Sequence, residues 1–158
     1  MAKKIYRAID IATWFVNRVD RDSGDDITHL KLQKLVYYAQ SWHLANYHEP
    51  LFKEDILAWT HGPVIMTVWL KYKQHNWQSL PPEKIDTEID CKSAKFLELV
   101  YQSYAHINAK TLEKMTHDEP PWREARGNLP LEAKCTTPIN VETMRTYYRG
   151  LIETSNAR

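Results

Sequence analysis

Seven histidines in a chain of 158 residues are the side chains best suited to acid–base chemistry. His61 comes directly before Gly62-Pro63, and His117 comes directly before Asp118-Glu119. Either imidazole could act as a general base near a carboxylate. No candidate nucleophile or phosphate-binding loop accompanies them, and a loop histidine that hydrogen-bonds to a helix end is the simpler interpretation. We therefore expect no catalytic residue and no enzyme activity.

The histidines and cysteines are also poorly spaced for metal binding. His43 and His48 lie five residues apart, on different faces of a helix, and no His-Glu-x-x-His pattern occurs. His43 falls on an apolar stripe, where packing in the core is a simpler role than ligation. Cys91 and Cys135 lie far apart without a Cys-x-x-Cys pair, so neither zinc nor a disulfide framework is indicated. We expect no metal and no cofactor.

Two further groups of side chains could bind a macromolecule. A basic surface with interleaved aromatic rings would suit nucleic acid, and it could be formed by Lys31, Lys34, Lys71, Tyr72, Lys73 and Trp77. The balance of 21 basic and 20 acidic residues gives a net charge of +1, which argues against a nucleic-acid partner. Trp77 and Trp122 lie in segments typical of loops, where a tryptophan either completes local packing or anchors a protein partner.

A long helical pattern over residues 28–47 must position these side chains. Apolar residues occupy one stripe and also the neighbouring sides, which is typical of a helix packed on more than one flank. The stripe contains Leu32, Leu35, Val36, Ala39, Trp42, His43 and Asn46, and the neighbouring sides carry Tyr37, Tyr38, Leu44 and Ala45. We predict that residues 28–47 form the central helix of the fold.

The rest of the chain is predicted to be helical apart from one short segment. Apolar spacing and capping residues predict helices over residues 4–21, 63–75, 93–104, 108–115, 121–126 and 141–152. In the third helix of the chain, Pro63 would occupy the first position. In the last helix, the inward stripe would be Val141, Met144, Tyr148, Leu151 and Ile152. Residues 51–52 and 56–59 could pair as two short strands or form an irregular link.

The predicted fold is therefore mainly α. We expect a compact single-domain bundle of about seven helices over residues 1–158, with at most a short β-hairpin near residues 51–59. No apolar run approaches the roughly 20 residues that would cross a bilayer. The unremarkable charge, the two separated cysteines and the lack of a signal-peptide pattern favour a cytoplasmic protein without a membrane partner.

Three segments carry motifs that together are specific. The first is Leu30-Lys-Leu-Gln-Lys-Leu-Val-Tyr-Tyr-Ala-Gln-Ser-Trp-His-Leu44, and the second is Leu51-Phe-x-Glu-x-Ile-x-Ala-Trp-x-x-Gly-Pro-Val64. The third is Thr116-His-x-Glu-x-Pro-Trp122. In order and spacing they resemble the Panacea antitoxin family, also described as phage-associated GepA-like or SocA-like proteins. The similarity extends over nearly the whole chain.

The resemblance implies a helical, non-enzymatic antitoxin of a toxin–antitoxin system. Such a protein binds a toxin encoded in the same operon directly and neutralises it. The resemblance also implies two alternatives, a proteolysis adaptor that delivers a toxin to the ClpXP protease and a phage-associated regulatory protein. No oligomeric state is predicted. The candidate partner-binding or motif residues are Lys34, Tyr37, Tyr38, Trp59, His61, Gly62, Pro63, Val64, Trp77, His117, Glu119, Pro121 and Trp122.

The motifs also suggest how the site is arranged. Residues 59–64 and 116–122 both contain turn-forming prolines next to a tryptophan. We expect the two turns to lie close together, held in place by the central helix. Partner recognition would then take place on the surface around them.

Overall fold

A computed structural model describes residues 4–156 of the chain. Within this range the structure contains seven α-helices, two short 3-10 helices and one two-stranded hairpin, as the mainly α prediction expected. In chain order the elements are α1 (Ala8–Arg18), η1 (Arg21–Ser23), α2 (His29–Tyr47), β1 (Leu57–Trp59), β2 (Gly62–Val64), α3 (Met66–Tyr72), η2 (Lys73–His75), α4 (Cys91–Tyr104), α5 (Ala109–His117), α6 (Pro120–Arg126) and α7 (Val141–Asn156).

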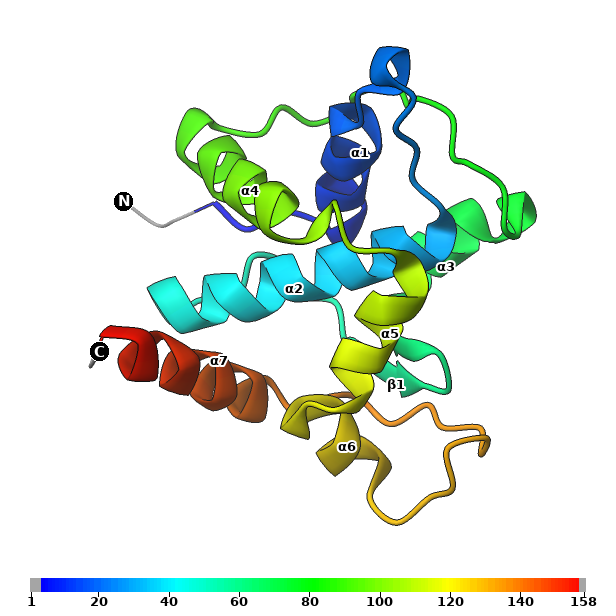
Figure 1. Cartoon of the computed structure of the whole chain (residues 1–158). Coiled ribbons are helices and arrows are strands. Elements are labelled where there is room, and N and C mark those ends of the chain that lie inside the picture. The colour runs from blue at the N-terminus through cyan, green and yellow to red at the C-terminus, as the bar shows by residue number, and fades with distance from the viewer. Residues whose placement is uncertain (1–3, 157–158) are drawn as a thin grey trace.

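Helix α2 is the centre of the fold, as predicted. It begins where Thr28 Oγ1 accepts a hydrogen bond from the Lys31 backbone N–H, and it ends at His48 in the left-handed region. Figure 1 shows α2 crossing the middle of the molecule, with α1 and α4 on one side and α7 on the other. Buried residues therefore occur all around the helix, although Asn46 of the predicted stripe is exposed and Trp42 is only partly buried.

The N-terminal helix is shorter than predicted because the residues before it are extended. Tyr6 lies in a parallel β-bridge with Phe52, and its backbone N–H donates to the Leu51 carbonyl at 2.9 Å. This contact prevents a helix from starting at residue 4, and α1 begins at Ala8. It also gives Leu51 and Phe52 a partner other than residues 56–59, so, of the two alternatives for these segments, pairing with each other does not occur.

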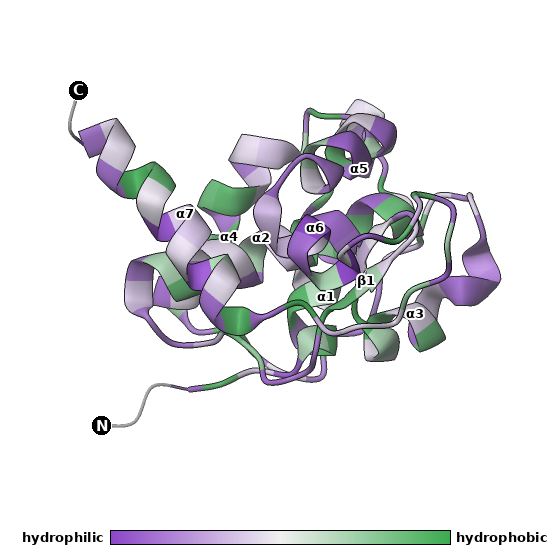
Figure 2. Cartoon of the chain, turned by 90° about the horizontal axis from the view of Figure 1, so that it is seen from below, coloured by the Kyte–Doolittle hydropathy of each residue, from purple (hydrophilic) through white to green (hydrophobic). Residues whose placement is uncertain are grey.

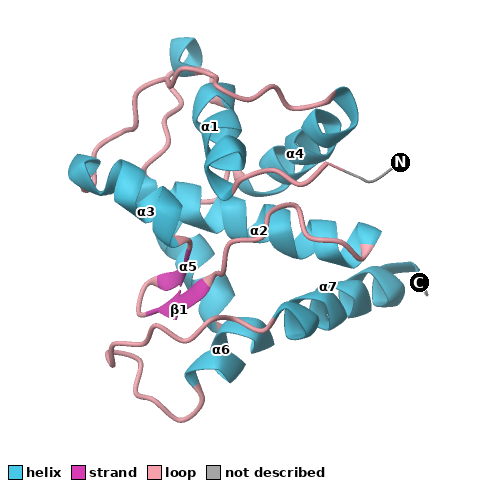
Figure 3. Cartoon of the chain, turned by 180° about the vertical axis from the view of Figure 1, so that it is seen from behind, coloured by secondary structure: helices cyan, strands magenta, loops and turns pink. Residues whose placement is uncertain are grey.

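The hairpin instead joins β1 to β2 around residues 60 and 61, as Figure 3 shows in magenta. Pro63 lies inside β2, opposite Ala58, and not at the start of a helix as predicted. The Ala58 N–H donates to the Thr137 carbonyl, and the Ala58 carbonyl accepts from Arg126. Ala58 therefore requires no backbone hydrogen bond from the residue opposite, and a proline, which has no N–H, is tolerated at position 63.

The last helix packs on α2 and α6 by a narrower stripe than predicted. Asn140 caps the helix by accepting a hydrogen bond from the Thr143 N–H, and Met144 and Tyr148 are buried. Val141 and Leu151, predicted to face inward, are 48% and 41% exposed. Figure 2 shows hydrophobic and hydrophilic positions alternating along α7. An edge helix buries only one side, which explains why the predicted stripe was too wide.

One hydrophobic cluster connects α1, α2, α4 and α7 with the hairpin. Its contributors include Phe15, Leu35, Phe52, Leu97 and Tyr148. Within residues 4–156, none of the helices has the length and hydropathy that a membrane crossing would require.

Candidate functional site

The two predicted turns pack against each other beside α2, and we call residues 59–64 and 116–122 the turn pair. The Trp122 indole N–H donates to the Trp59 carbonyl at 2.9 Å. Gly62 has a φ of +101°, and a Cβ there would lie 2.7 Å from Lys34 Cε and 2.9 Å from Thr116 Oγ1. Only glycine allows both this backbone conformation and this close approach. The predicted neighbourhood of the two turns is confirmed.

Trp122 is the residue on which the turn pair is built. Its ring stacks on His117 with centroids 4.0 Å apart, and the Arg126 guanidinium lies 4.8 Å from the ring centre. Arg126 is itself buried and donates to the Ala58 carbonyl at 3.0 Å and to the Ala133 carbonyl at 2.6 Å. Burial lowers the pKa of His117, so this imidazole is neutral at pH 7.

Lys34 is a fully buried cation under the hairpin turn. Its side chain has no exposed surface, and its Nζ lies 3.4 Å from the Pro63 carbonyl oxygen. None of the ion pairs found among residues 4–156 includes Lys34. Burial lowers the pKa of Lys34 to about 7, although the charge of Glu113 acts in the opposite direction. Burial therefore disfavours the charged form of this side chain.

Glu119 accepts hydrogen bonds from two buried tyrosines. The Tyr38 hydroxyl donates to Oε1 at 2.7 Å, and the Tyr148 hydroxyl donates to Oε2 at 2.8 Å. Tyr148 comes from α7, so this carboxylate joins the second turn to α2 and to the last helix. Burial raises the pKa of Glu119, and the two hydrogen bonds only partly counteract that shift.

We expect Glu119→Ala to lower the free energy of unfolding by about 2 to 4 kcal/mol, because two buried hydroxyls lose their acceptor. Glu119→Gln keeps an acceptor and is expected to be at least as stable as wild type at pH 7. Because the pKa of Glu119 is raised in the folded state, its contribution to the free energy of unfolding is fully present below about pH 4.5 and is lost as the pH rises through the folded-state pKa. The glutamine side chain does not ionise, so the Glu119→Gln variant should not lose stability over this pH range. Urea unfolding at two pH values measures both effects. Equal losses in the two variants would contradict this role.

A groove lies next to the turn pair, and we call it the tryptophan groove. It has a volume of about 310 Å³ and lies between α2, the hairpin turn and the α3–η2 segment. Trp59, Trp69 and Trp77 form much of its wall, and Trp77 is 72% exposed. The titratable side chains that line it are His29, Lys34, His61 and Lys73. The groove therefore combines apolar area with basic groups.

One donor in the groove wall has no acceptor. The Trp59 indole N–H is buried, and among residues 4–156 it has no hydrogen-bond partner. The Trp59 ring lies edge-on to Trp69, with centroids 5.5 Å apart. A buried donor without an acceptor is unfavourable by about 1 to 3 kcal/mol, so it is more easily explained where a ligand completes the site.

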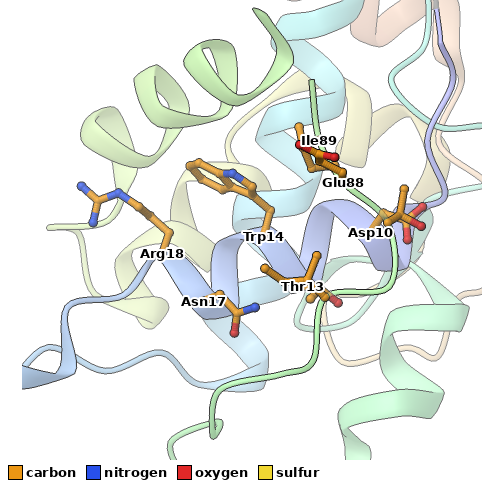
Figure 4. Close-up of a pocket in the computed structure, with 9 residues that line it drawn as sticks. Asp10, Thr13, Trp14, Asn17, Arg18, Glu88 and Ile89 are labelled. Carbon is orange, nitrogen blue, oxygen red and sulfur yellow. The ribbon is translucent and has the colours of Figure 1, made fainter. Parts of the chain in front are cut away.

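A second hollow of about 310 Å³ lies between α1 and the segment 85–89. Figure 4 shows Trp14 and Thr13 on α1 opposite Glu88 and Ile89, with Asp10 at one end and Arg18 at the other. Asp10 is paired with Arg7, and Arg18 is paired with Glu98 at 2.6 Å. Because its charged groups have both signs, and Asp10 and Arg18 have internal partners, this hollow shows less preference for a charged ligand than the tryptophan groove.

The candidate residues divide into a buried set and an accessible set. The buried ones cannot touch a partner in this conformation and instead shape the site: they are Lys34, Tyr37, Tyr38, Gly62, Pro63, Val64, Pro121 and Trp122. Those with at least partial exposure are Trp59, His61, Trp77, His117 and Glu119. Of the two loop tryptophans, Trp122 completes packing, and Trp77 is accessible to a partner.

The basic surface considered for nucleic acid does not form. Lys34 and Tyr72 are fully buried, and the Lys31 ammonium donates to the Ala105 carbonyl. Within residues 4–156, no cluster of three or more histidine, cysteine, aspartate or glutamate side chains could hold a metal ion. His43, predicted to pack in the core, is buried.

Sequence reasoning missed several residues of the site. Trp69 is not among the candidate residues from the sequence, and Lys73 appears there only in the basic surface considered for nucleic acid, but both line the groove. Lys73 Nζ lies 4.9 Å from the Trp69 ring centre, and their spacing of one helical turn is a signal that could have linked them. Arg126 and Tyr148 had no comparable signal, because their partners are far away in the sequence.

Comparison with protein families gives one match. A family model described as antitoxin SocA-like, Panacea domain, matches residues 32–123. This span begins in α2 and includes the hairpin, the groove-lining α3–η2 segment and both turns of the turn pair. No curated protein and no solved structure matches the chain.

Proposed function

Because the chain belongs to the SocA-like antitoxin family with a Panacea domain, we propose that it is an antitoxin that binds a protein toxin directly. The toxin would be encoded in the same operon. Neutralisation would consist of covering the toxin's functional surface and would require no chemical step in this chain.

The observation that carries this proposal is the rigid construction of the turn pair beside an open, aromatic groove. Trp122, Gly62 and Glu119 each fix a turn through contacts with distant elements. A surface that is ordered before binding loses little conformational entropy when it binds. Exposed Trp77 and half-exposed Trp59 supply the large rings that dominate protein interfaces.

Three titratable residues of the turn pair support a binding role over catalysis. Glu119 is engaged by two tyrosine hydroxyls, and His117 is stacked on Trp122. His61 is exposed, and its Nδ1 lies 3.2 Å from Oε1 of Glu113, whose Oε2 is paired with Lys110. These contacts give each group a structural partner, and we therefore propose that the protein is not an enzyme.

Co-expression tests this function. We expect the neighbouring open reading frame, induced alone, to stop growth, and we expect growth to return when this chain is produced with it. The two proteins should also co-purify after an affinity tag is placed on either one. A harmless neighbour, or a toxic neighbour that is neither rescued nor co-purified, would reject the proposal.

The same strain distinguishes sequestration from delivery to a protease. Sequestration predicts that the half-life of the neighbour is the same with and without ClpX while growth is rescued. Rescue that disappears when ClpX is deleted, together with a longer half-life of the neighbour, would replace sequestration by the adaptor role.

A further inference from the structure

The starting observation is a buried lysine outside any ion pair among residues 4–156; the charge of Glu113 acts on it, but that carboxylate is paired with His61 and Lys110. Lys34 has no exposed surface, belongs to none of the ion pairs found among residues 4–156, and forms part of the wall of the tryptophan groove. An isolated charge in the interior is costly, and proteins normally pair it or neutralise it. A lysine at this position therefore favours the arrival of an external negative charge.

Of the other titratable groups of the groove, Lys73 is an exposed cation, whereas burial lowers the pKa of His29 to about 4 and keeps that imidazole neutral. His29, His61 and Lys73 line it together with Lys34, and no aspartate or glutamate does. The chain as a whole contains 20 acidic residues against 21 basic ones, so an acid-free groove is not a consequence of composition. Glu113 lies beside His61, outside the groove lining, and has two internal partners.

Apolar recognition is available in the same place. Trp59, Trp69 and Trp77 line the groove, and Trp77 has most of its surface exposed. Rings of this size contribute strongly when a partner's side chain covers them. Trp59 also carries a buried N–H that lacks an acceptor among residues 4–156 and is therefore a free donor.

We propose that the tryptophan groove binds an acidic segment of the partner protein, with a carboxylate near Lys34 and Lys73 and a neighbouring apolar side chain against the three tryptophans. Lys34 attracts the carboxylate through the groove wall, because charge in the protein interior is weakly screened. Lys73 and Trp77 make the direct contacts. This inference rests on the proposed function, since it describes how the toxin would be held.

The geometry favours an acidic protein segment over nucleic acid. A nucleic-acid strand carries a charge on every nucleotide and needs a track of exposed cations. In this groove Lys34 is buried and His61 lies beside Glu113, so Lys73 is the exposed lysine of the lining. One or two carboxylates next to an apolar side chain match this arrangement better.

The first experiment uses the co-expressed neighbouring protein and four single variants of the full chain. Lys73→Glu and Trp77→Ala change the groove, whereas Lys95→Glu and Leu99→Ala change exposed positions on α4 as matched controls. We expect each groove variant to weaken the measured affinity by about 10- to 30-fold and each control by less than about twofold. Thermal unfolding checks that all four variants are folded. A complex that forms equally well with all four would reject the groove and leave the antitoxin function standing.

The second experiment does not depend on the neighbouring protein. A ten-residue peptide with a central phenylalanine between aspartates is titrated into the chain, with indole signals followed by nuclear magnetic resonance. The same peptide with asparagines is one control, and a ten-nucleotide thymidine strand is another. We expect the aspartate peptide to bind at least about tenfold more tightly than the asparagine peptide and to shift the Trp77 indole signal. Equal binding of the two peptides, or preferential binding of the oligonucleotide, would overturn the proposal even if the neighbour proves to be a toxin.

Discussion

Lys34→Met is expected to make the folded chain more stable by roughly 1 to 4 kcal/mol at pH 7, the range seen when buried charges give way to apolar side chains. Methionine keeps the unbranched shape of the side chain and removes the charge that has no anionic partner. The same variant should bind the partner more weakly. A gain of stability combined with a loss of binding would indicate that the lysine is retained for function and not for stability.

The pH dependence of stability provides an independent measurement of the same residue. Burial lowers the folded-state pKa of Lys34 from 10.5 to about 7. Between these values the unfolded chain holds a proton that the folded chain has released. The contribution of Lys34 to the free energy of unfolding is therefore fully present above the pKa of the unfolded state, and it is lost as the pH falls through the pKa of the folded state. Over this window the wild-type free energy of unfolding should rise by about 1.4 kcal/mol per pH unit.

Urea unfolding between about pH 7.5 and pH 9.5 checks this expectation. Lys34→Met should lose that slope, so the two stability curves converge as pH rises. Parallel curves, or a methionine variant that is less stable than wild type, would mean that the ammonium has an anionic partner in the fold.

Trp122→Ala is expected to lower the free energy of unfolding by about 3 to 5 kcal/mol, the usual range for a buried large ring. The ring is 2% exposed, donates to the Trp59 carbonyl and stacks on His117. Its removal should release the two turns from each other, so binding should fail because the surface is no longer ordered. A urea denaturation series measures the first effect, and co-purification measures the second.

Trp77→Ala is the matched control for that variant. It removes the same type of side chain from a site that is 72% exposed, so stability should change by less than about 0.5 kcal/mol. Binding should nevertheless weaken. If both alanine variants lost the same stability, the assignment of Trp122 to packing and Trp77 to recognition would be wrong.

The helices could be predicted where their signals come from residues that are close together in the sequence. The spacing of apolar residues in α2, the Thr28 and Asn140 caps and the prolines at the start of α6 all operate within one or two turns. Their signals do not depend on the rest of the chain. The positions of these elements therefore agree with expectation to within a few residues.

The hairpin could not be derived in the same way. Three-residue strands carry little periodicity, and their pairing depends on distant segments. Leu51 is held by Tyr6, and Ala58 is held between Thr137 and Arg126. Without those contacts the sequence favours residues 51–52 as a strand partner, which the structure replaces with residues 62–64.

The motifs predicted the place of the candidate site but not the roles of its residues. A lysine on a helix is usually solvated, yet Lys34 belongs to a helix with apolar residues on several sides and therefore had little solvent-exposed surface available. From the sequence alone, Glu119 was a candidate partner-binding or motif residue without a predicted contact. Its hydrogen bonds from Tyr38 and Tyr148, more than 20 residues away, show that it is also a structural acceptor.

The long-range hydrogen bonds of the turn pair also determine the stage of folding at which the candidate site can form. Trp122 and Trp59 are 63 residues apart, Arg126 and Ala58 are 68 apart, and Glu119 and Tyr38 are 81 apart. Contacts of such separation form slowly, because the long intervening chain must lose its freedom first. A growing chain on the ribosome can form α2 long before α6 has been synthesised. The turn pair is therefore a late product of folding, and a truncated chain that ends before Trp122 would lack the contacts that hold its two turns together.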